Sequence, residues 1–86
     1  MTWNLSITGP AQKDFKRLPQ KDQERVKAIL IAMQADPFQG DLKRLKGKET
    51  AWRRRVGNYR IIYDLYFDGH LIVIQGILRR TSTTYE

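Results

Sequence analysis

Four arginines lie within eight positions in the stretch AWRRRVGNYR, residues 51–60. An arginine guanidinium can bind a phosphate through two parallel hydrogen bonds, and it keeps its charge throughout the pH range in which proteins fold. Like charges crowded onto a short strand repel each other, so folding alone does not explain why these arginines are together. The cluster therefore predicts a surface that binds a phosphate-bearing partner.

The charge of the whole chain agrees with this prediction. Its 86 residues include 16 Lys and Arg against 9 Asp and Glu, a formal net charge of +7. Such a balance predicts a polyanionic or acidic partner, with nucleic acid as the first candidate, while a basic surface that only keeps the protein soluble is the open alternative. The chain has no cysteine and a single histidine, His70, so we expect neither a disulfide framework nor a metal site, and no cofactor.

The length of the chain indicates a single domain, residues 1–86, with a modest core. No apolar run approaches the roughly 20 residues of a membrane span, and the start MTWNLSITGP lacks the pattern of a signal peptide. We therefore expect a cytoplasmic protein without a membrane partner.

The first half of the chain predicts a strand and two helices. Apolar and polar residues alternate over residues 3–7, which is typical of a half-buried strand. A short helix is expected over residues 11–18, after Pro10. A longer amphipathic helix is expected over residues 20–35, where Val26, Ile29, Leu30 and Met33 follow helical spacing. Residues 38–50 predict a basic loop, with a short strand as the alternative.

The second half of the chain predicts three strands. Residues 51–56, 59–67 and 70–80 are strand-like and are separated by Gly57-Asn58 and Asp68-Gly69, which favour tight hairpin turns. The expected order is β-α-α-β-β-β. This order predicts an α+β fold in which two N-terminal helices pack on one face of an antiparallel sheet.

The first hairpin predicts where the arginines point. A turn at 57–58 places Arg55 opposite Arg60, and alternation along the strand puts Arg53 on the same face. The apolar residues of this hairpin share the other face, which suits the helices. Arg54 is expected on that helix face among aromatic residues, and the sequence offers no reason for it.

The second hairpin predicts a fourth member of the same patch. A turn at 68–69 places Arg60 opposite Ile77 and Asn58 opposite Arg79, so Arg79 is expected on the open face, diagonal to Arg60. The sequence therefore predicts that Arg53, Arg55, Arg60 and Arg79 share one patch.

Three segments carry a family resemblance. The segments LKRLKG, WRRRVGNYRIIY and an arginine six positions before a tyrosine follow two predicted helices in this order. In this arrangement the chain resembles the RelE/ParE superfamily of toxins from type II toxin–antitoxin modules, in particular the RelE branch, over nearly its whole length. The resemblance implies an mRNA interferase, a metal-independent endoribonuclease that cuts messenger RNA in the ribosomal A site. It also implies an antitoxin partner with an acidic toxin-binding segment, besides the ribosome and mRNA.

The resemblance also implies the residues of the site. The catalytic set of the RelE branch corresponds to Arg53, Arg55, Arg60, Arg79 and Tyr85, and the neighbouring basic residues Lys43, Arg44, Lys46, Lys48 and Arg80 would contact RNA or the ribosome. We expect the RNA 2′-hydroxyl to attack its neighbouring phosphate. Arg55 and Arg60 would clamp the phosphate, Arg79 would stabilise or protonate the leaving oxygen, and Tyr85 would orient or stack a base. Some relatives have lysine where Arg53 stands, and arginine is a poor general base, so the base is unassigned.

Two other functions stay open at this point. The ParE branch of the same fold poisons DNA gyrase through protein contacts, and its members typically lack the complete basic-plus-tyrosine set. A catalytically inactive module could instead bind RNA or the ribosome through the same arginines. We expect His70, the one histidine, in the turn after residue 69, far along the strand from Arg60, as a loop residue.

Overall fold

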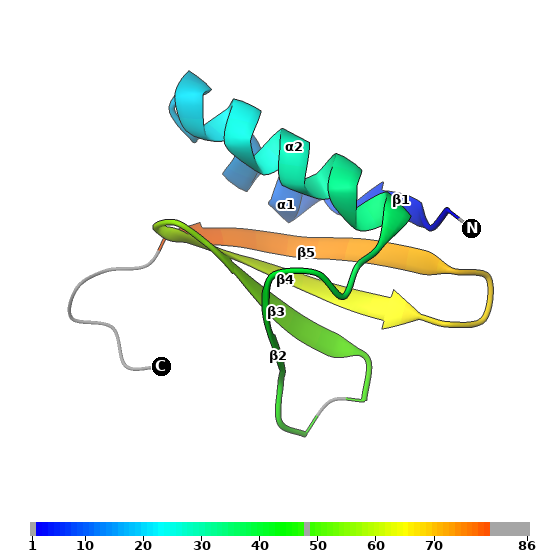
Figure 1. The fold of residues 1–86 in the computed structure, drawn as a ribbon. Helices are drawn as coiled ribbons and strands as arrows, with labels where there is room; N and C mark the ends of the chain where they lie inside the picture. Colours follow the sequence, from blue (N-terminus) through cyan, green and yellow to red (C-terminus); the bar gives the residue numbers. More distant parts are fainter. Residues whose placement is uncertain (1, 48, 80–86) are drawn as a thin grey trace.

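The protein forms one sheet with two helices on a single face (Figure 1). The structure is a computed structural model and describes residues 2–47 and 49–79. Its elements are β1 (Asn4–Ile7), α1 (Gly9–Lys16), α2 (Gln20–Ala35), β2 (Asp41–Arg44), β3 (Ala51–Val56), β4 (Tyr59–Tyr66) and β5 (Leu71–Arg79). The five strands lie in the order β1-β5-β4-β3-β2. The predicted α+β fold is confirmed, and residues 38–50 contain the short strand that was the alternative there.

One feature of the predicted sheet is wrong: the sheet is mixed, because β1 pairs with β5 in parallel. The other neighbouring strands are antiparallel. Tight turns dictate the direction of β3, β4 and β5, whereas the chain leaves β1 through two helices before it returns to the sheet. No local turn signal therefore specified the direction of β1.

The helices begin and end close to the predicted residues. The Thr8 side chain accepts a hydrogen bond from the Ala11 amide and caps α1, so this helix begins two residues earlier than residue 11. The bounds of α2 match the prediction, and Val26, Leu30 and Met33 are buried on its inner face. Among the described residues, no helix is long and apolar enough to cross a membrane.

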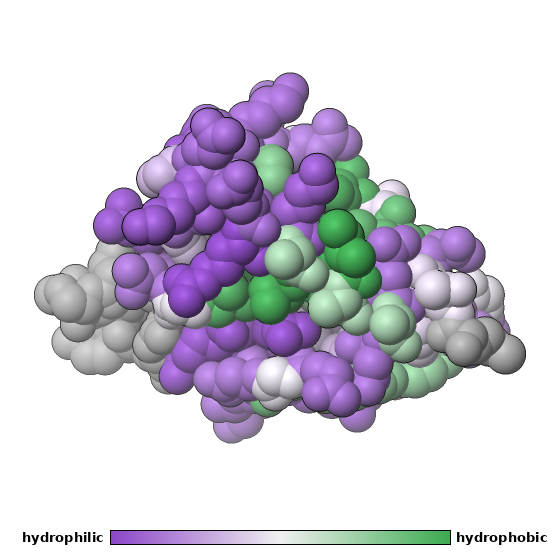
Figure 2. All heavy atoms as spheres, turned by 45° about the horizontal axis from the view of Figure 1, so that its top comes forward, coloured by the Kyte–Doolittle hydropathy of each residue, from purple (hydrophilic) through white to green (hydrophobic). Residues whose placement is uncertain are grey.

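The core lies between the helices and the covered face of the sheet. Seen from the helix side, the outer surface of the helices is polar and an apolar band lies between them and the sheet (Figure 2). The β-strand side chains Ile61, Tyr63, Leu65, Ile72 and Ile74 are almost completely buried there. Burial raises the pKa of Tyr63 to about 12, because an ionised phenol would lose its hydration. The helices cover only this face (Figure 1), so the second face of the sheet is open to other contacts.

A β-bulge changes the register between β4 and β5. Tyr63 lies opposite Ile74, as the turn predicts, but the pairing shifts by one residue between Ile62 and Tyr63. Beyond the shift Arg60 lies opposite Leu78, and Tyr59 lies opposite Arg79. The predicted pairs of Arg60 with Ile77 and of Asn58 with Arg79 are therefore wrong.

Side chains from the start of the chain support this bulge. The Ile77 amide donates a 3.0 Å hydrogen bond to the Asp14 carboxylate, and the Thr8 hydroxyl donates to the carbonyls of Ile74 and Gln75. The bond to Asp14 gives the Ile77 amide a side-chain acceptor beside the bulge, and Thr8 ties the neighbouring carbonyls to the start of α1. The register near the site thus depends on residues more than 60 positions away in the sequence.

Candidate functional site

Charged side chains, most of them basic, form two rows across the open face of the sheet. In the first row Asp41 of β2 lies opposite Arg55 of β3, which lies opposite Arg60 of β4. In the second row Lys43 lies opposite Arg53. The hairpin register predicted from the turn at 57–58 is confirmed. Because alternate residues of a strand share a face, Arg53, Arg55 and Arg60 lie together on the side without helices.

These arginines surround a hollow of about 360 Å³. Its lining includes six basic side chains and two apolar ones: Lys43, Arg44, Lys46, Arg53, Arg55 and Arg60, with Leu45 and Ile62. β3 and β4 supply Arg53, Arg55 and Arg60, and the end of β2 with the following loop supplies Arg44 and the two lysines. A concave surface with several convergent cations favours a phosphate group, and the apolar side chains offer a surface for a base or ribose.

The three open-face arginines are only partly exposed. The side chain of Arg53 is 11% exposed and that of Arg55 is 32% exposed. Their guanidinium groups are therefore partly removed from water, where interactions with an anion are stronger than at a fully exposed site.

Asp41 supplies a carboxylate within this arginine cluster. Its Oδ1 lies 3.8 Å from Arg53 Nη1, and its Oδ2 lies 3.8 Å from Arg55 Nε. Both separations are longer than a good hydrogen bond. Arg53 Nη1 is buried and has no hydrogen-bond partner among the described residues. Asp41 was not predicted from the sequence, although its place two residues before Lys43 in a strand would have indicated the same face.

Arg54 points away from this cluster, as predicted. It lies opposite Leu42 and Ile61, is 9% exposed, and its charge lowers the pKa of Tyr63 against the larger effect of burial. A Cβ added to Gly40, whose φ is +94°, would lie 2.6 Å from the Arg54 guanidinium. The glycine therefore lets the chain before β2 pass close over this buried arginine.

Arg79 does not lie with the arginine cluster, which corrects the predicted patch. It lies opposite Tyr59, whose hydroxyl donates a 2.7 Å hydrogen bond to the Asp22 carboxylate of α2. That bond raises the pKa of Tyr59. The bulge adds one residue between the turn and Arg79, and a shift of one residue moves a side chain to the opposite face. Arg79 is exposed at the end of β5, on the helix side.

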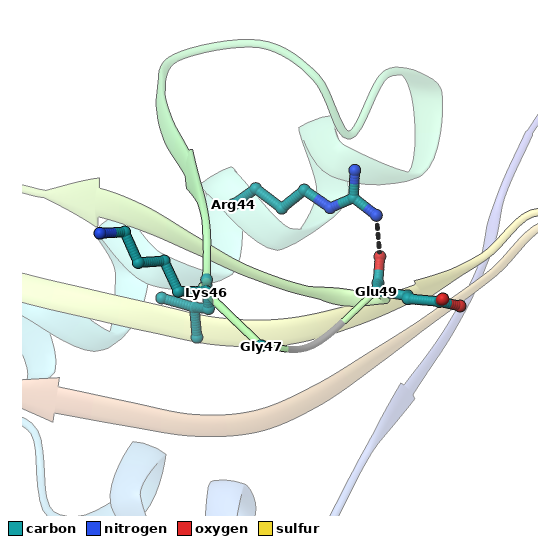
Figure 3. A pocket seen from close by; sticks show the side chains of 5 residues that line it. Arg44, Lys46, Gly47 and Glu49 are labelled. Carbon is teal, nitrogen blue, oxygen red and sulfur yellow. Dashed lines mark hydrogen bonds between the residues drawn. The ribbon is translucent and has the colours of Figure 1, made fainter.

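Two of the predicted RNA contacts, Arg44 and Lys46, lie at the end of β2 and in the loop that follows it. Arg44 donates a 2.8 Å hydrogen bond to the main-chain carbonyl of Glu49, and the Lys46 side chain points away from this contact (Figure 3). Arg44 therefore closes the loop and also borders the hollow. The remaining predicted residues, Lys48, Arg80 and Tyr85, lie outside the described residues.

His70 and the possible metal ligands do not form a second site near the arginine cluster in the part of the chain that the structure describes. His70 occupies the turn between β4 and β5, at the opposite end of β4 from Arg60, and its ring packs 4.9 Å from that of Trp3. It is a loop residue, as predicted. Within residues 2–47 and 49–79, no group of three or more His, Asp or Glu side chains could hold a metal ion.

The fold is that of a class of small α+β proteins with solved structures. The toxin in the archaeal RelE–RelB complex from Pyrococcus horikoshii is similar in structure, with a TM-score of 0.83 and 24% identity over 96% of this chain and 100% of that one. Two sequence relatives come from Methanocaldococcus jannaschii. RelE1 is 32% identical over 83 residues, 93% of this chain and 92% of its own length. Toxin RelE3 is 34% identical over 74 residues, 81% of this chain and 82% of its own.

The family model described as the ParE toxin of a type II toxin–antitoxin system, parDE, matches residues 5–83. The chain therefore belongs to the RelE/ParE family and is a toxin of a type II toxin–antitoxin system.

Proposed function

We propose that this toxin is a ribosome-dependent endoribonuclease that cuts messenger RNA in the ribosomal A site and so inhibits translation in the cytoplasm. The observation that supports this proposal is the convergence of Arg53, Arg55 and Arg60 on one hollow of the open sheet face. The names of the relatives RelE1 and RelE3 also favour the RelE branch.

The proposed reaction transfers a phosphoryl group within the RNA. The 2′-oxygen loses its proton and forms a bond to phosphorus, while the bond from phosphorus to the 5′-oxygen breaks and that oxygen gains a proton. The products are a 2′,3′-cyclic phosphate and a 5′-hydroxyl. Arg55 and Arg60 would hold the non-bridging oxygens, where negative charge grows in the transition state. Arg53 would add a third cation, since a guanidinium keeps its proton too firmly to act as the base.

Tyr85 belongs to the proposal through the family resemblance, and we assign it to the flanking base. Arg79 lies on the helix side of the sheet, so we assign it no contact with the leaving oxygen. Because Arg79 lies beside Tyr59 and not in the row of Arg60, we assign the phosphate contacts to the open-face arginines alone. Replacing Arg60 by alanine should therefore reduce the cleavage rate more than replacing Arg79 does.

The second proposed partner is a cognate antitoxin. The toxin from Pyrococcus horikoshii was solved as a RelE–RelB complex. The net charge of this chain is +7, so we propose that an acidic antitoxin segment covers part of the basic face and blocks RNA there.

The chemistry of the cut ends tests the proposed function. A messenger is translated in a purified system with the toxin, and the fragments are analysed for a 2′,3′-cyclic phosphate upstream of the cut and a 5′-hydroxyl downstream. A matched messenger carries a 2′-O-methyl group on the nucleotide that supplies the attacking oxygen. We expect cyclic phosphate from the first messenger and no cut at that position in the second. A cut that persists in the methylated messenger would contradict the proposed reaction.

DNA gyrase inhibition is the second candidate function, because the matching family model has the ParE name. A supercoiling assay with purified gyrase tests it. Inhibition of supercoiling together with intact messenger would favour this function over RNA cleavage.

A further inference from the structure

Asp41 places a carboxylate where an RNA phosphate would bind. The backbone register holds it directly opposite Arg55, and its two oxygens lie 3.8 Å from Arg53 Nη1 and from Arg55 Nε. A carboxylate and a phosphate both offer a guanidinium a pair of oxygens at similar spacing. Asp41 therefore makes to these two arginines the kind of contact that the proposed substrate would make.

The contact between Asp41 and the two arginines is weak enough for a phosphate to replace it. The Asp41 side chain is 58% exposed on the edge strand β2, whereas the arginines that it faces are 11% and 32% exposed. Ion pairs with an exposed partner at this distance are weak. Arg53 Nη1 is buried without a hydrogen bond among the described residues, so a phosphate that approaches more closely gains a bond that Asp41 does not make.

We propose that Asp41 is an internal competitor for RNA. It neutralises part of the charge of Arg53 and Arg55 in the RNA-free toxin and lowers the affinity of the open face for any phosphate. Free RNA then binds weakly, while messenger held by the ribosome is presented at a high local concentration that offsets the weaker binding. Asp41 thus limits the binding of free RNA to the open face. This inference rests on the proposed function of the arginine site.

Binding of free RNA tests the inference. The probe is a fluorescent single-stranded RNA of about 12 nucleotides with 2′-O-methyl groups throughout, which cannot undergo the cut, and its anisotropy is measured against toxin concentration. The variants are Asp41→Asn, Asp68→Asn and Arg55→Ala. Asp68 is an exposed carboxylate in the turn between β4 and β5, so its replacement changes the net charge equally but away from the site.

We expect Asp41→Asn to bind the RNA about three- to fivefold more tightly than the wild type. The plot of log Kd against log salt concentration should steepen by up to about 0.7, the value for one additional phosphate contact on a single strand. Asp68→Asn should stay within about 1.5-fold of the wild type, because its charge is screened from the site. Thermal melting of each variant confirms that it is folded.

Each other outcome overturns the inference in a distinct way. Equal tightening by Asp41→Asn and Asp68→Asn would mean that only net charge matters, and weaker binding by Asp41→Asn would mean that Asp41 positions the arginines. In both cases a loss of RNA binding in Arg55→Ala would still support the proposed RNA site. Unchanged binding in Arg55→Ala, or no binding by any of the proteins, would overturn both the inference and the site on which it rests.

Discussion

The replacement of Arg55 by alanine should separate function from stability. Arg55 is 32% exposed and faces both Asp41 and Arg60. Its loss removes an ion pair with an exposed partner, worth at most about 1 kcal/mol, and also removes a like-charge contact that costs roughly 0.2–1 kcal/mol. These two effects oppose each other, so we expect the free energy of unfolding to change by less than about 1 kcal/mol. For a domain of this size, the melting temperature should stay within about 5 °C of the wild type.

The effect on RNA cleavage should be much larger. Loss of one positioned donor to a developing anion typically reduces the rate about 10²- to 10³-fold. The assay is cleavage of a defined messenger by a translating ribosome, with melting followed by circular dichroism on the same preparations. The reasoning is refuted if Arg55→Ala cleaves at the wild-type rate, or if it melts more than about 10 °C below the wild type.

Arg54 provides the matched control on the same strand. It is 9% exposed on the helix side and lines no part of the hollow. Arg54→Ala leaves space in the covered layer and should destabilise the fold by about 1–3 kcal/mol. Below its melting temperature it should cleave RNA at close to the wild-type rate. Cleavage as weak as in Arg55→Ala would show that this assay does not distinguish the two faces.

Three further predictions concern the support of the site. Asp14→Ala removes the acceptor of the Ile77 amide at the bulge, so we expect a loss of about 1–3 kcal/mol in a urea melt, and an unchanged midpoint would contradict the role of this bond. Gly40→Ala should also lower the urea midpoint, because alanine is strained at φ +94° and its Cβ would meet Arg54; an equally stable variant would refute that packing. The pKa of Tyr63 is raised to about 12 in the folded state, above the value near 10 of an unfolded chain. Its contribution to stability is therefore fully present below about pH 10 and is lost as pH rises to about 12, a fall that Tyr63→Phe should reduce.

Local patterns in the sequence were sufficient for the helices and for the first hairpin. Helical spacing of Val26, Leu30 and Met33 predicted α2, and the glycine turn at 57–58 set the pairing of Arg55 with Arg60. Both features depend on residues close together in the chain. For the same reason the sequence was enough to predict that Arg53 and Arg55 of β3 lie on the open face.

The missed features depend on contacts between distant residues. The bulge that moves Arg79 to the helix side is supported by Asp14 and Thr8, and no pattern within β5 indicates those partners. Similarly, Asp41 joined the site only because β2 pairs with β3, in a segment too short and too polar to predict a strand with any register. Long-range pairing therefore decided both corrections to the predicted site.

Primer extension on one defined messenger in a purified translation system tests the central claim most directly. Wild-type toxin and Arg60→Ala are each added with and without ribosomes. We expect cuts within codons only when ribosomes and the wild-type toxin are both present. Messenger that stays intact in all four reactions, or that Arg60→Ala cuts as fast as the wild type, would contradict the assignment of RNA cleavage to the arginine face.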